Sequence, residues 1–328
     1  ETHKITCKDC GAVLVASEPH TVNSSGDACA DCGTRFAAKL AMGGNTTYYE
    51  KLDNAIRAAE SSTDKSTRLT LLMNVYGETA IRGGTFTLDL NGRSLVSGRD
   101  YNALRIANSN VEITGEGTLS GDHGVDVKQG SLLISGGTYE ADTAVIYSNA
   151  TVTVTGGTFT ARNREFTNNL YGSTDVPVLS GGTYTNGLRI GVPSQPVSNL
   201  LAPGYRYWQN GSMLKPTDST TSLSGTITVA LCDHSDGQAG APYTNRGDGT
   251  HTATYSCCGK ATEPVDHSYT FTADNANGTI TRACDCGERL VFTLVLPGQQ
   301  TYGDPAMAVP SYTCSDTGYS GTLPVITV

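Results

Sequence analysis

A short pattern recurs in the middle of the chain at intervals of about twenty residues. Each copy has alternating apolar residues and then a glycine-rich corner, which reads Gly-Gly-Thr-Phe/Tyr in three of the four copies at 111–119, 133–139, 152–159 and 178–184. The interval is 20 residues between the threonines of the first three copies and 25 residues before the last. A unit of this length holds two or three short strands and makes one turn of a solenoid, whereas a propeller blade needs about twice as many residues.

The residues between the corners have the periodicity of strands. Val152 and Val154 alternate with polar residues, as in a strand with one buried face. A second short apolar segment precedes each corner, at 103–106, 124–127 and 144–147. We therefore predict a mostly β chain whose middle, roughly residues 65 to 200, is a right-handed parallel β-helix.

Two places in the repeat predict columns of side chains along the solenoid. One column is apolar and the other aromatic, and their members are Ile134, Val154 and Leu179 in the first and Tyr139, Phe159 and Tyr184 in the second. We expect both columns to face inward. An outward aromatic column would resemble a carbohydrate platform, but stacking inside the core is the interpretation we favour.

The end coils of a solenoid expose unpaired edges and need caps. Residues 49–59 place Leu52, Ala55, Ile56 and Ala59 on one helical face. We predict that this segment is an amphipathic helix that caps the N-terminal end. Residues 69–75 then start the first coil.

The order of these segments resembles a known family. Residues 48–56 are followed by Leu69-Thr70-Leu71-Leu72, by Leu88-Asp89-Leu90-Asn91-Gly92, and then by the repeated Gly-Gly-Thr-Phe/Tyr. Over about residues 38 to 215, and at the closing segment 200–208, this order is similar to the pectate-lyase-like β-helices of large Gram-positive surface proteins. The resemblance implies the fold and a secreted, bacterial cell-surface location. It leaves enzyme, adhesin and inert stalk open, since this scaffold carries all three.

Charge and hydropathy argue against two kinds of partner. The net charge is -9, whereas nucleic-acid binding needs clustered Lys and Arg. No run approaches eighteen apolar residues, so we expect no membrane insertion. The chain opens with Glu1 and stops at Val328 within an apparent strand, and we expect it to be a fragment of a longer protein. We expect a monomer.

The ten cysteines lie near the two ends, with none between Cys32 and Cys232. The ends therefore have the composition of small stapled modules, and the middle must be held by its own packing. We predict a zinc-ribbon-like module at 1–37, the parallel β-helix with its cap helix at 38–215, a Cys- and His-containing β module at 216–290, and the start of a β-sandwich-like, Ig-like module at 291–328.

Two Cys-x-x-Cys-Gly knuckles stand in the N-terminal module. Their cysteines are Cys7, Cys10, Cys29 and Cys32, with 18 residues between the knuckles. This spacing fits a tetrahedral Zn²⁺ site, which would be structural because four thiolates leave no position for water or substrate. A pair of disulfides is the alternative in an extracellular protein. His3 and His20 could replace a ligand, but we expect them to be bystanders.

The C-terminal end repeats the order His, Cys pair, Gly, His, Cys pair, Gly with different gaps. The residues are, in order, His251, Cys257, Cys258, Gly259, His267, Cys284, Cys286 and Gly287. A second zinc site could use these four cysteines, with His234 or His267. Disulfides that include Cys232 and Cys314 are the rival interpretation. A module that has lost its metal is a third.

One outer corner of the coils gathers charged residues. With a period of 20, Asp122, Asp142 and Arg162 fall at equivalent positions, beside His123 and Arg164. Two carboxylates near an Arg and a His could perform acid–base chemistry or contact a ligand. A solvated corner explains the same residues without either role. We take all five as candidate ligand-binding residues and predict no catalytic residue.

The function that we predict is non-enzymatic: a bacterial surface module for binding or display. Its partner would be a host glycan or a secreted host protein such as mucin or immunoglobulin. A polysaccharide lyase or glycoside hydrolase on the β-helix face is one alternative, and a hydrolase would need two carboxylates facing each other across a groove. A passive structural stalk is the other.

Overall fold

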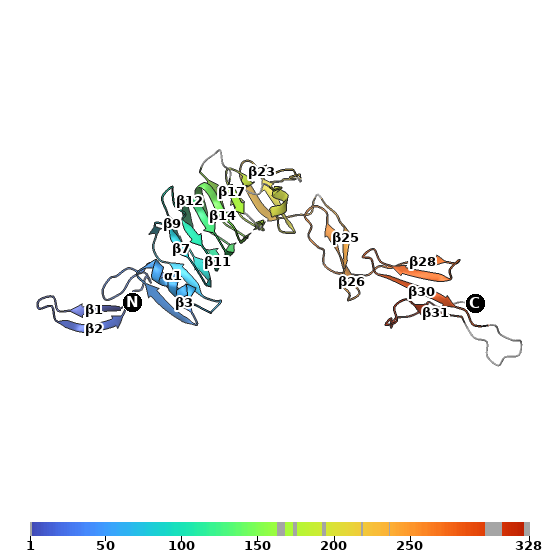
Figure 1. Ribbon diagram of the computed structural model, residues 1–328, viewed down its shortest axis with the longest axis horizontal. Helices are drawn as coiled ribbons and strands as arrows, with labels where there is room; N and C mark the ends of the chain where they lie inside the picture. Colours follow the sequence, from blue (N-terminus) through green and yellow to red (C-terminus); the bar gives the residue numbers. More distant parts are fainter. Residues whose placement is uncertain are drawn as a thin grey trace. The chain divides into compact units, whose positions relative to one another are not determined.

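The chain is mostly β, with 50% strand and 4% helix. The computed structural model describes residues 2–162, 168–172, 176–191, 195–217, 219–235, 237–298 and 310–324. Contacts divide the chain into two compact units, Glu1–Leu231 and Cys232–Val328. Figure 1 traces the elements of each unit.

The middle of the first unit is a β-solenoid of about five turns, which confirms the predicted parallel β-helix (Figure 1). One face is an eight-stranded sheet in which successive coils pair in parallel and two antiparallel strands close the N-terminal edge. Its parallel strands are β5 (Arg68–Leu71), β8 (Thr85–Asp89), β11 (Ser109–Thr114), β13 (Gly130–Ile134), β15 (Thr151–Val154) and β18 (Val178–Leu179), and its closing strands are β3 (Ala38–Met42) and β4 (Asn45–Tyr49).

The other faces belong to a fourteen-stranded sheet that turns a corner within its longest strands, β12 (Gly117–Val127) and β14 (Thr138–Ser148). The first parts of these two strands pair with β9 (Arg93–Val96) and β16 (Thr158–Ala161), and their last parts pair with β10 (Leu104–Ile106) and β17 (Asn168–Gly172). Shorter strands continue the two ladders: β6 (Val75–Tyr76), β7 (Thr79–Ile81), β19 (Thr183–Tyr184) and β20 (Leu188–Ile190).

Both predicted columns lie inside the solenoid. Ile134 pairs with Val154 and Val154 with Leu179, and all three side chains are fully buried. The aromatic rings are buried as well, and the centroid distances are 5.0 Å from Tyr139 to Phe159 and 4.9 Å from there to the ring of Tyr184. The interplanar angles of 13° and 12° show offset parallel stacking. The prediction of an inward aromatic column is therefore confirmed.

Each glycine of a Gly-Gly corner has its own steric role. A Cβ atom at Gly156 would lie 2.6 Å from the carbonyl oxygen of Ser135 in the preceding coil, so only glycine lets the coils stack at this point. The next residue, Gly157, has φ of +99°, which other residues rarely adopt. The two glycines of the corner therefore meet different requirements: the first leaves room for the preceding coil, and the second adopts a positive φ.

The ends of the solenoid are covered. The helix α1 (Leu52–Glu60) buries Leu52, Ala55, Ile56 and Ala59, which confirms the predicted cap. At the other end, β24 (Ile227–Leu231) pairs antiparallel with β19, so the sheet continues to Leu231. The remaining elements of this end are the 3-10 helix η1 (Val197–Leu200) and the strands β21 (Tyr205–Gln209), β22 (Ser212–Met213) and β23 (Ser222–Leu223).

Small antiparallel sheets make up the cysteine-containing ends. The N-terminal sheet is a hairpin of β1 (Thr2–Thr6) and β2 (Val13–Pro19). The second unit has a three-stranded sheet and a four-stranded sheet: β25 (Ala239–Asn245), β26 (Thr250–Tyr255) and β27 (Val265–Asp266), then β28 (Thr270–Asp274), β29 (Thr279–Ala283), β30 (Arg289–Val295) and β31 (Ser311–Cys314). A bilayer-spanning helix needs some twenty apolar residues, and no helix in the described ranges meets that requirement.

Candidate functional site

Cysteine and histidine side chains gather into three groups of four. The groups are His3, His20, Cys29 and Cys32; Cys232, His234, Cys257 and Cys258; and His251, His267, Cys284 and Cys286. Within each group the ligand atoms lie within 4.8 Å of one another. None of the ten cysteines, all of which lie within the described ranges, forms a disulfide. Each group therefore has the composition and the closeness that a metal ion requires.

The first group joins the hairpin β1–β2 to the knuckle that follows it. The rings of His3 and His20 lie side by side, with centroids 5.0 Å apart. Nδ1 of His20 lies 3.5 Å from Sγ of Cys32, and Nε2 of the same ring donates a hydrogen bond of 2.9 Å to Glu50. A carboxylate on the far nitrogen is the usual support of a metal-binding histidine.

The unpartnered nitrogen of His3 is a second sign of a ligand in the first group. This side chain is only 9% exposed, and its Nδ1 has no hydrogen-bond partner among the described residues. Buried polar atoms without partners are rare in proteins. Burial raises the pKa of the Cys29 thiol, but backbone N–H groups and His20 outweigh it and lower that pKa to about 6. The knuckle therefore stabilises a thiolate, the form that binds a metal.

The membership of this group differs from the four-cysteine set that the spacing predicts. Cys29 and Cys32 belong to it, but Cys7 and Cys10 do not and lie at the tip of the hairpin between β1 and β2. Their places are taken by the two histidines that we expected to be bystanders. The chain folds the hairpin so that its two histidines, and not its tip, face the second knuckle.

The second group lies where the segment before β25 meets the turn after β26. Sγ of Cys257 lies 3.4 Å from Sγ of Cys232 and 3.6 Å from Nδ1 of His234, and Sγ of Cys258 lies 3.4 Å from the same nitrogen. The ring of His234 stacks on Tyr255 at 3.8 Å. Burial and the neighbouring thiols raise the pKa of Cys257 to about 12. Three thiols this close cannot all ionise unless a cation joins them.

The third group uses the start of β26 and the turn between β29 and β30. Sγ of Cys284 lies 3.7 Å from Nδ1 of His251, and Sγ of Cys286 lies 3.6 Å from Nε2 of His267. The two imidazole rings stack with their centroids 5.4 Å apart, close to the 5.0 Å that separates the tilted rings of the first group. Nδ1 of His267 contacts Glu288 at 2.5 Å, which again supplies a supporting carboxylate.

The four C-terminal cysteines predicted as one site are thus divided between two groups. Cys257 and Cys258 join Cys232 and His234, and the other pair joins two histidines. Strand β26 serves both groups, because His251 stands near its start and the first cysteine pair follows its end. The repeated order of His, Cys pair, His, Cys pair was the signal for the histidine ligands. Spacing between cysteines alone could not show which pairs meet.

The charged corner of the solenoid is a set of internal ion pairs. Arg162 lies 2.9 Å from Glu140 and 3.6 Å from Asp142, and Arg99 lies 3.7 Å from the same Asp142. The register slips by one residue in this corner, after Gly121. The two aspartates of the predicted strip therefore do not stack as a simple column.

The remaining strip residues have separate partners. Asp122 accepts a hydrogen bond from Thr143, and Nδ1 of His123 lies 2.7 Å from Oδ1 of Asn102. The ring of His123 stacks on Tyr147 at 5.1 Å. Burial lowers the pKa of His123. Arg164, the fifth predicted residue, lies outside the described residues.

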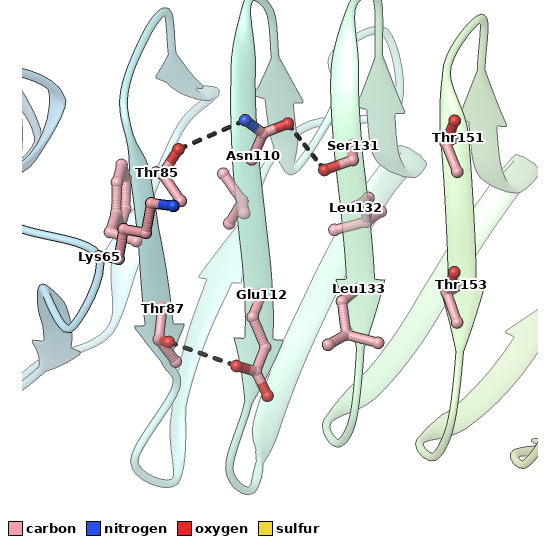
Figure 2. Close-up of a pocket in the computed structure, with 12 residues that line it drawn as sticks. Lys65, Thr85, Thr87, Asn110, Glu112, Ser131, Leu132, Leu133, Thr151 and Thr153 are labelled. Carbon is pink, nitrogen blue, oxygen red and sulfur yellow. Dashed lines mark hydrogen bonds between the residues drawn. The ribbon is translucent and has the colours of Figure 1, made fainter.

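A groove follows the outer side of the eight-stranded sheet, over β8, β11, β13 and β15 (Figure 2). Its volume is about 450 Å³. Asn110 donates to Thr85 at 3.3 Å and accepts from Ser131 at 2.8 Å, so one row of polar side chains crosses three coils. In the next row, Thr87 donates to Glu112 at 3.4 Å. The groove offers hydrogen-bonding groups at the spacing of the coils, about 4.8 Å.

No family model, no curated protein and no solved structure matches the chain.

Proposed function

We propose that the chain is a non-enzymatic binding or display segment of a bacterial cell-surface protein, in which structural Zn²⁺ ions hold small β modules beside a β-solenoid. The proposal rests on one observation: the Cys and His side chains of the three groups, like the charged side chains of the solenoid corner, contact one another and do not line the outer groove. The Cys and His side chains meet one another in sets of four, and the charged corner of the solenoid pairs within itself. The lining of the outer groove is mainly apolar, and its polar groups are mostly neutral hydroxyls with the amide of Asn110.

Zinc is supported by the donor set and by the distances within each group. Tetrahedral Zn²⁺ has Zn–S bonds of about 2.3 Å and Zn–N bonds of about 2.0–2.1 Å, so ligand atoms stand about 3.3–3.8 Å apart. The contacts of 3.4–3.7 Å between ligand atoms within the groups lie in this range. A disulfide would bring two sulfurs to about 2.05 Å. Four protein ligands leave no position for a substrate, so the metal would stabilise structure.

Metal content tests this part of the proposal. Native mass spectrometry of the chain, refolded with zinc, should show three bound ions. Cys284→Ser should remove one of them, because the third group loses a thiolate. Cys314→Ser is the matched control, since Cys314 belongs to none of the groups, and it should keep all three. Equal zinc content in the two variants would contradict the assignment.

The partner that we propose is a host glycan or a secreted host protein such as mucin or immunoglobulin, bound along the groove. Rows of hydroxyl and amide groups suit an extended polar ligand that runs across the coils. A single charge, Glu112, stands among the labelled residues of β11 to β15, with Lys65 beside β8 (Figure 2). This composition supports recognition by hydrogen bonds more than acid–base chemistry, for which a groove with two facing carboxylates would be needed.

Arrays of glycans and of secreted host proteins test the binding proposal. Ser131→Arg and Thr153→Arg would fill the groove and should abolish binding. Thr46→Arg, on the exposed edge strand β4 of the same sheet, is the matched control and should leave it unchanged. Release of reducing sugars from a polysaccharide panel would instead establish an enzyme. Absence of any ligand in both arrays would favour a passive stalk.

A further inference from the structure

The hairpin β1–β2 and the strand pair β26–β27 are two copies of one metal-binding unit. The first histidine of each copy lies opposite the residue that stands two positions before the second histidine: His3 pairs with Glu18, and His251 pairs with Val265. In both copies the two rings are neighbours, with centroids 5.0 Å and 5.4 Å apart and interplanar angles of 33° and 27°. The histidines then meet a later cysteine pair in the same way.

The tips of the two copies have the same backbone fold. The N–H of Cys7 donates to the carbonyl of Ala12 at 2.7 Å, as the N–H of Tyr255 donates to Lys260 at 2.9 Å. In both copies a glycine with positive φ stands eight residues after the first histidine: Gly11 with φ of +71° and Gly259 with φ of +70°. When the two copies are aligned in this way, Cys10 corresponds to Cys258.

The copies differ at the first sulfur of the tip. Cys7 stands where the other copy has Tyr255, and the first sulfur of that copy comes from Cys257, two positions later. The N-terminal tip shares its backbone turn with the knuckle at Cys29 as well. Gly11 N–H donates to the carbonyl of Cys7 at 2.9 Å, and the glycine after Cys32 donates to the carbonyl of Cys29 at 3.0 Å, as Gly259 N–H does to the carbonyl of Tyr255 at 2.8 Å. Because the N-terminal tip combines this turn with the Cys-x-x-Cys-Gly sequence of the second knuckle, Cys7 and Cys10 have the local geometry of Cys29 and Cys32.

The C-terminal copy shows what such a tip meets. Cys257 and Cys258 face Cys232 and His234, which precede β25, and β25 then pairs with β26. In the N-terminal copy, the sheet that contains β1 has only two strands among the described residues. The edge of β1 that corresponds to the β25 side of β26 thus has no strand in that sheet. Among the described residues, the N-terminal copy thus has no counterpart of Cys232, of His234 or of β25.

We propose that Cys7 and Cys10 are half of a fourth Zn²⁺ site, which is completed by an incoming β-strand with a Cys-x-His pair ahead of it. The strand adds to the open edge of β1, as β25 adds to β26, and its cysteine and histidine close the tetrahedron. This inference rests on the proposed zinc sites. The occupant is a strand segment with the chemistry of residues 227–249, which hold Cys232, His234 and β25.

The test supplies that segment in two ways. In the first, residues 227–249 are joined directly before Thr2 of the full chain, because Thr2-His3 corresponds to Thr250-His251. In the second, a synthetic peptide of the same residues is added to the zinc-loaded chain. Zinc is counted by native mass spectrometry, and alkylation of Cys7 and Cys10 by iodoacetamide is followed by peptide mapping. The matched control carries Cys232→Ser and His234→Ala within the added segment only.

The expected result is an increase from three zinc ions to four in at least one arm. Alkylation of Cys7 and Cys10 should slow by at least about tenfold, because a metal-bound thiolate no longer attacks freely. The control should stay at three ions with both cysteines reactive. A gain in the joined chain alone would mean that the segment binds only at the high effective concentration that the link provides, and a gain with the peptide would mean that it binds without a link.

Two results would overturn the inference. One is three ions in both arms with unchanged alkylation, which leaves the three proposed sites intact and removes the fourth. The other is protection of Cys7 and Cys10 in the 328-residue chain before any segment is added. Fewer than three ions in that chain would overturn the zinc proposal itself, and this inference with it.

Discussion

The solenoid and the modules that contain the Cys and His groups bury apolar side chains to different extents. The solenoid buries continuous columns such as Ile134, Val154 and Leu179, each fully buried. The modules bury little: all five residues of β28 are exposed, and in β29 each residue is only partly buried. Buried side chains in the second unit include three cysteines of the Cys and His groups, Cys232, Cys257 and Cys284.

This difference shows how one chain can combine two solutions to the same problem. A solenoid gains apolar burial with every coil that is added, so packing alone holds it. A hairpin of two or three strands is marginal in water and needs another source of stability. We propose that metal ions at the Cys and His groups provide it, because the free energy of binding such an ion would be folding free energy.

Chelation should separate the two regions most sharply. With zinc removed by excess EDTA, we expect the amides of β26 and β29 to exchange at close to the rate of an unfolded chain. Structural zinc contributes about 10–16 kcal/mol in small modules, so its loss exceeds what their cores supply. Amides of β11 and β13 should keep their protection. Hydrogen exchange followed by mass spectrometry gives both results in one experiment.

Two outcomes would break the comparison. Retained protection in β26 after chelation would mean that packing holds the modules. Loss of protection in β13 as well would mean that the solenoid depends on the metal sites. Addition of zinc after chelation is the control, and it should restore exchange in β26 and β29.

Removal of one ring from the aromatic column should test whether packing stabilises the solenoid. Phe159→Ala removes a ring that stacks on both neighbours, and we expect a loss of about 3–5 kcal/mol in the free energy of unfolding. Tyr76→Ala is the control, because Tyr76 is 77% exposed, and it should change the free energy by less than about 0.5 kcal/mol. Urea titration with zinc present measures both. Similar midpoints for the two variants would argue that the column adds no stability.

The solenoid was the more predictable of the two regions. Its period, its inward columns and its cap helix follow from local patterns, because each coil packs on a neighbour some twenty residues away. Leu52, Ala55, Ile56 and Ala59 were identified from helical periodicity alone and are the buried residues of α1. A repeated environment leaves a repeated sequence pattern, and such a pattern can be seen without coordinates.

The metal groups were less predictable for a physical reason. Cysteine spacing identifies a knuckle but not the residues that a knuckle faces. Cys29 meets His3 across a hairpin, and Cys257 meets Cys232 across another strand. These meetings depend on strand pairing, which has no fixed sequence separation. The predicted stacking of Asp122 on Asp142 was wrong for a similar reason. The register shifts by one residue after Gly121, so the two aspartates are not at equivalent positions.

A smaller effect should come from the corners of the coils. Gly156→Ala would place a Cβ atom 2.6 Å from the carbonyl oxygen of Ser135, and the coils would have to separate locally. We expect a loss of about 1–3 kcal/mol, the usual cost of overpacking. Gly83→Ala is the control in the same unit, because its Cβ would meet only a side-chain carbon at 3.9 Å. Urea titration in the presence of zinc should rank the two, and an equal loss would contradict the steric role of Gly156.

The smallest expected effect is a pH dependence that belongs to the solenoid and not to the modules. Burial lowers the pKa of His123, Lys128 adds to the lowering, and Asp122 and Asp126 oppose it. The unfolded chain therefore takes up the proton near the ordinary pKa of about 6.5, while the folded chain still holds the neutral ring. Stability from this residue is present above about pH 6.5 and is lost as the pH falls toward the folded pKa. His123→Gln should reduce the drop in urea midpoint between pH 7.5 and pH 5. Because the metal-binding histidines are the same in both proteins, their titration cancels in the difference, and an unchanged difference across this range would show that His123 does not contribute.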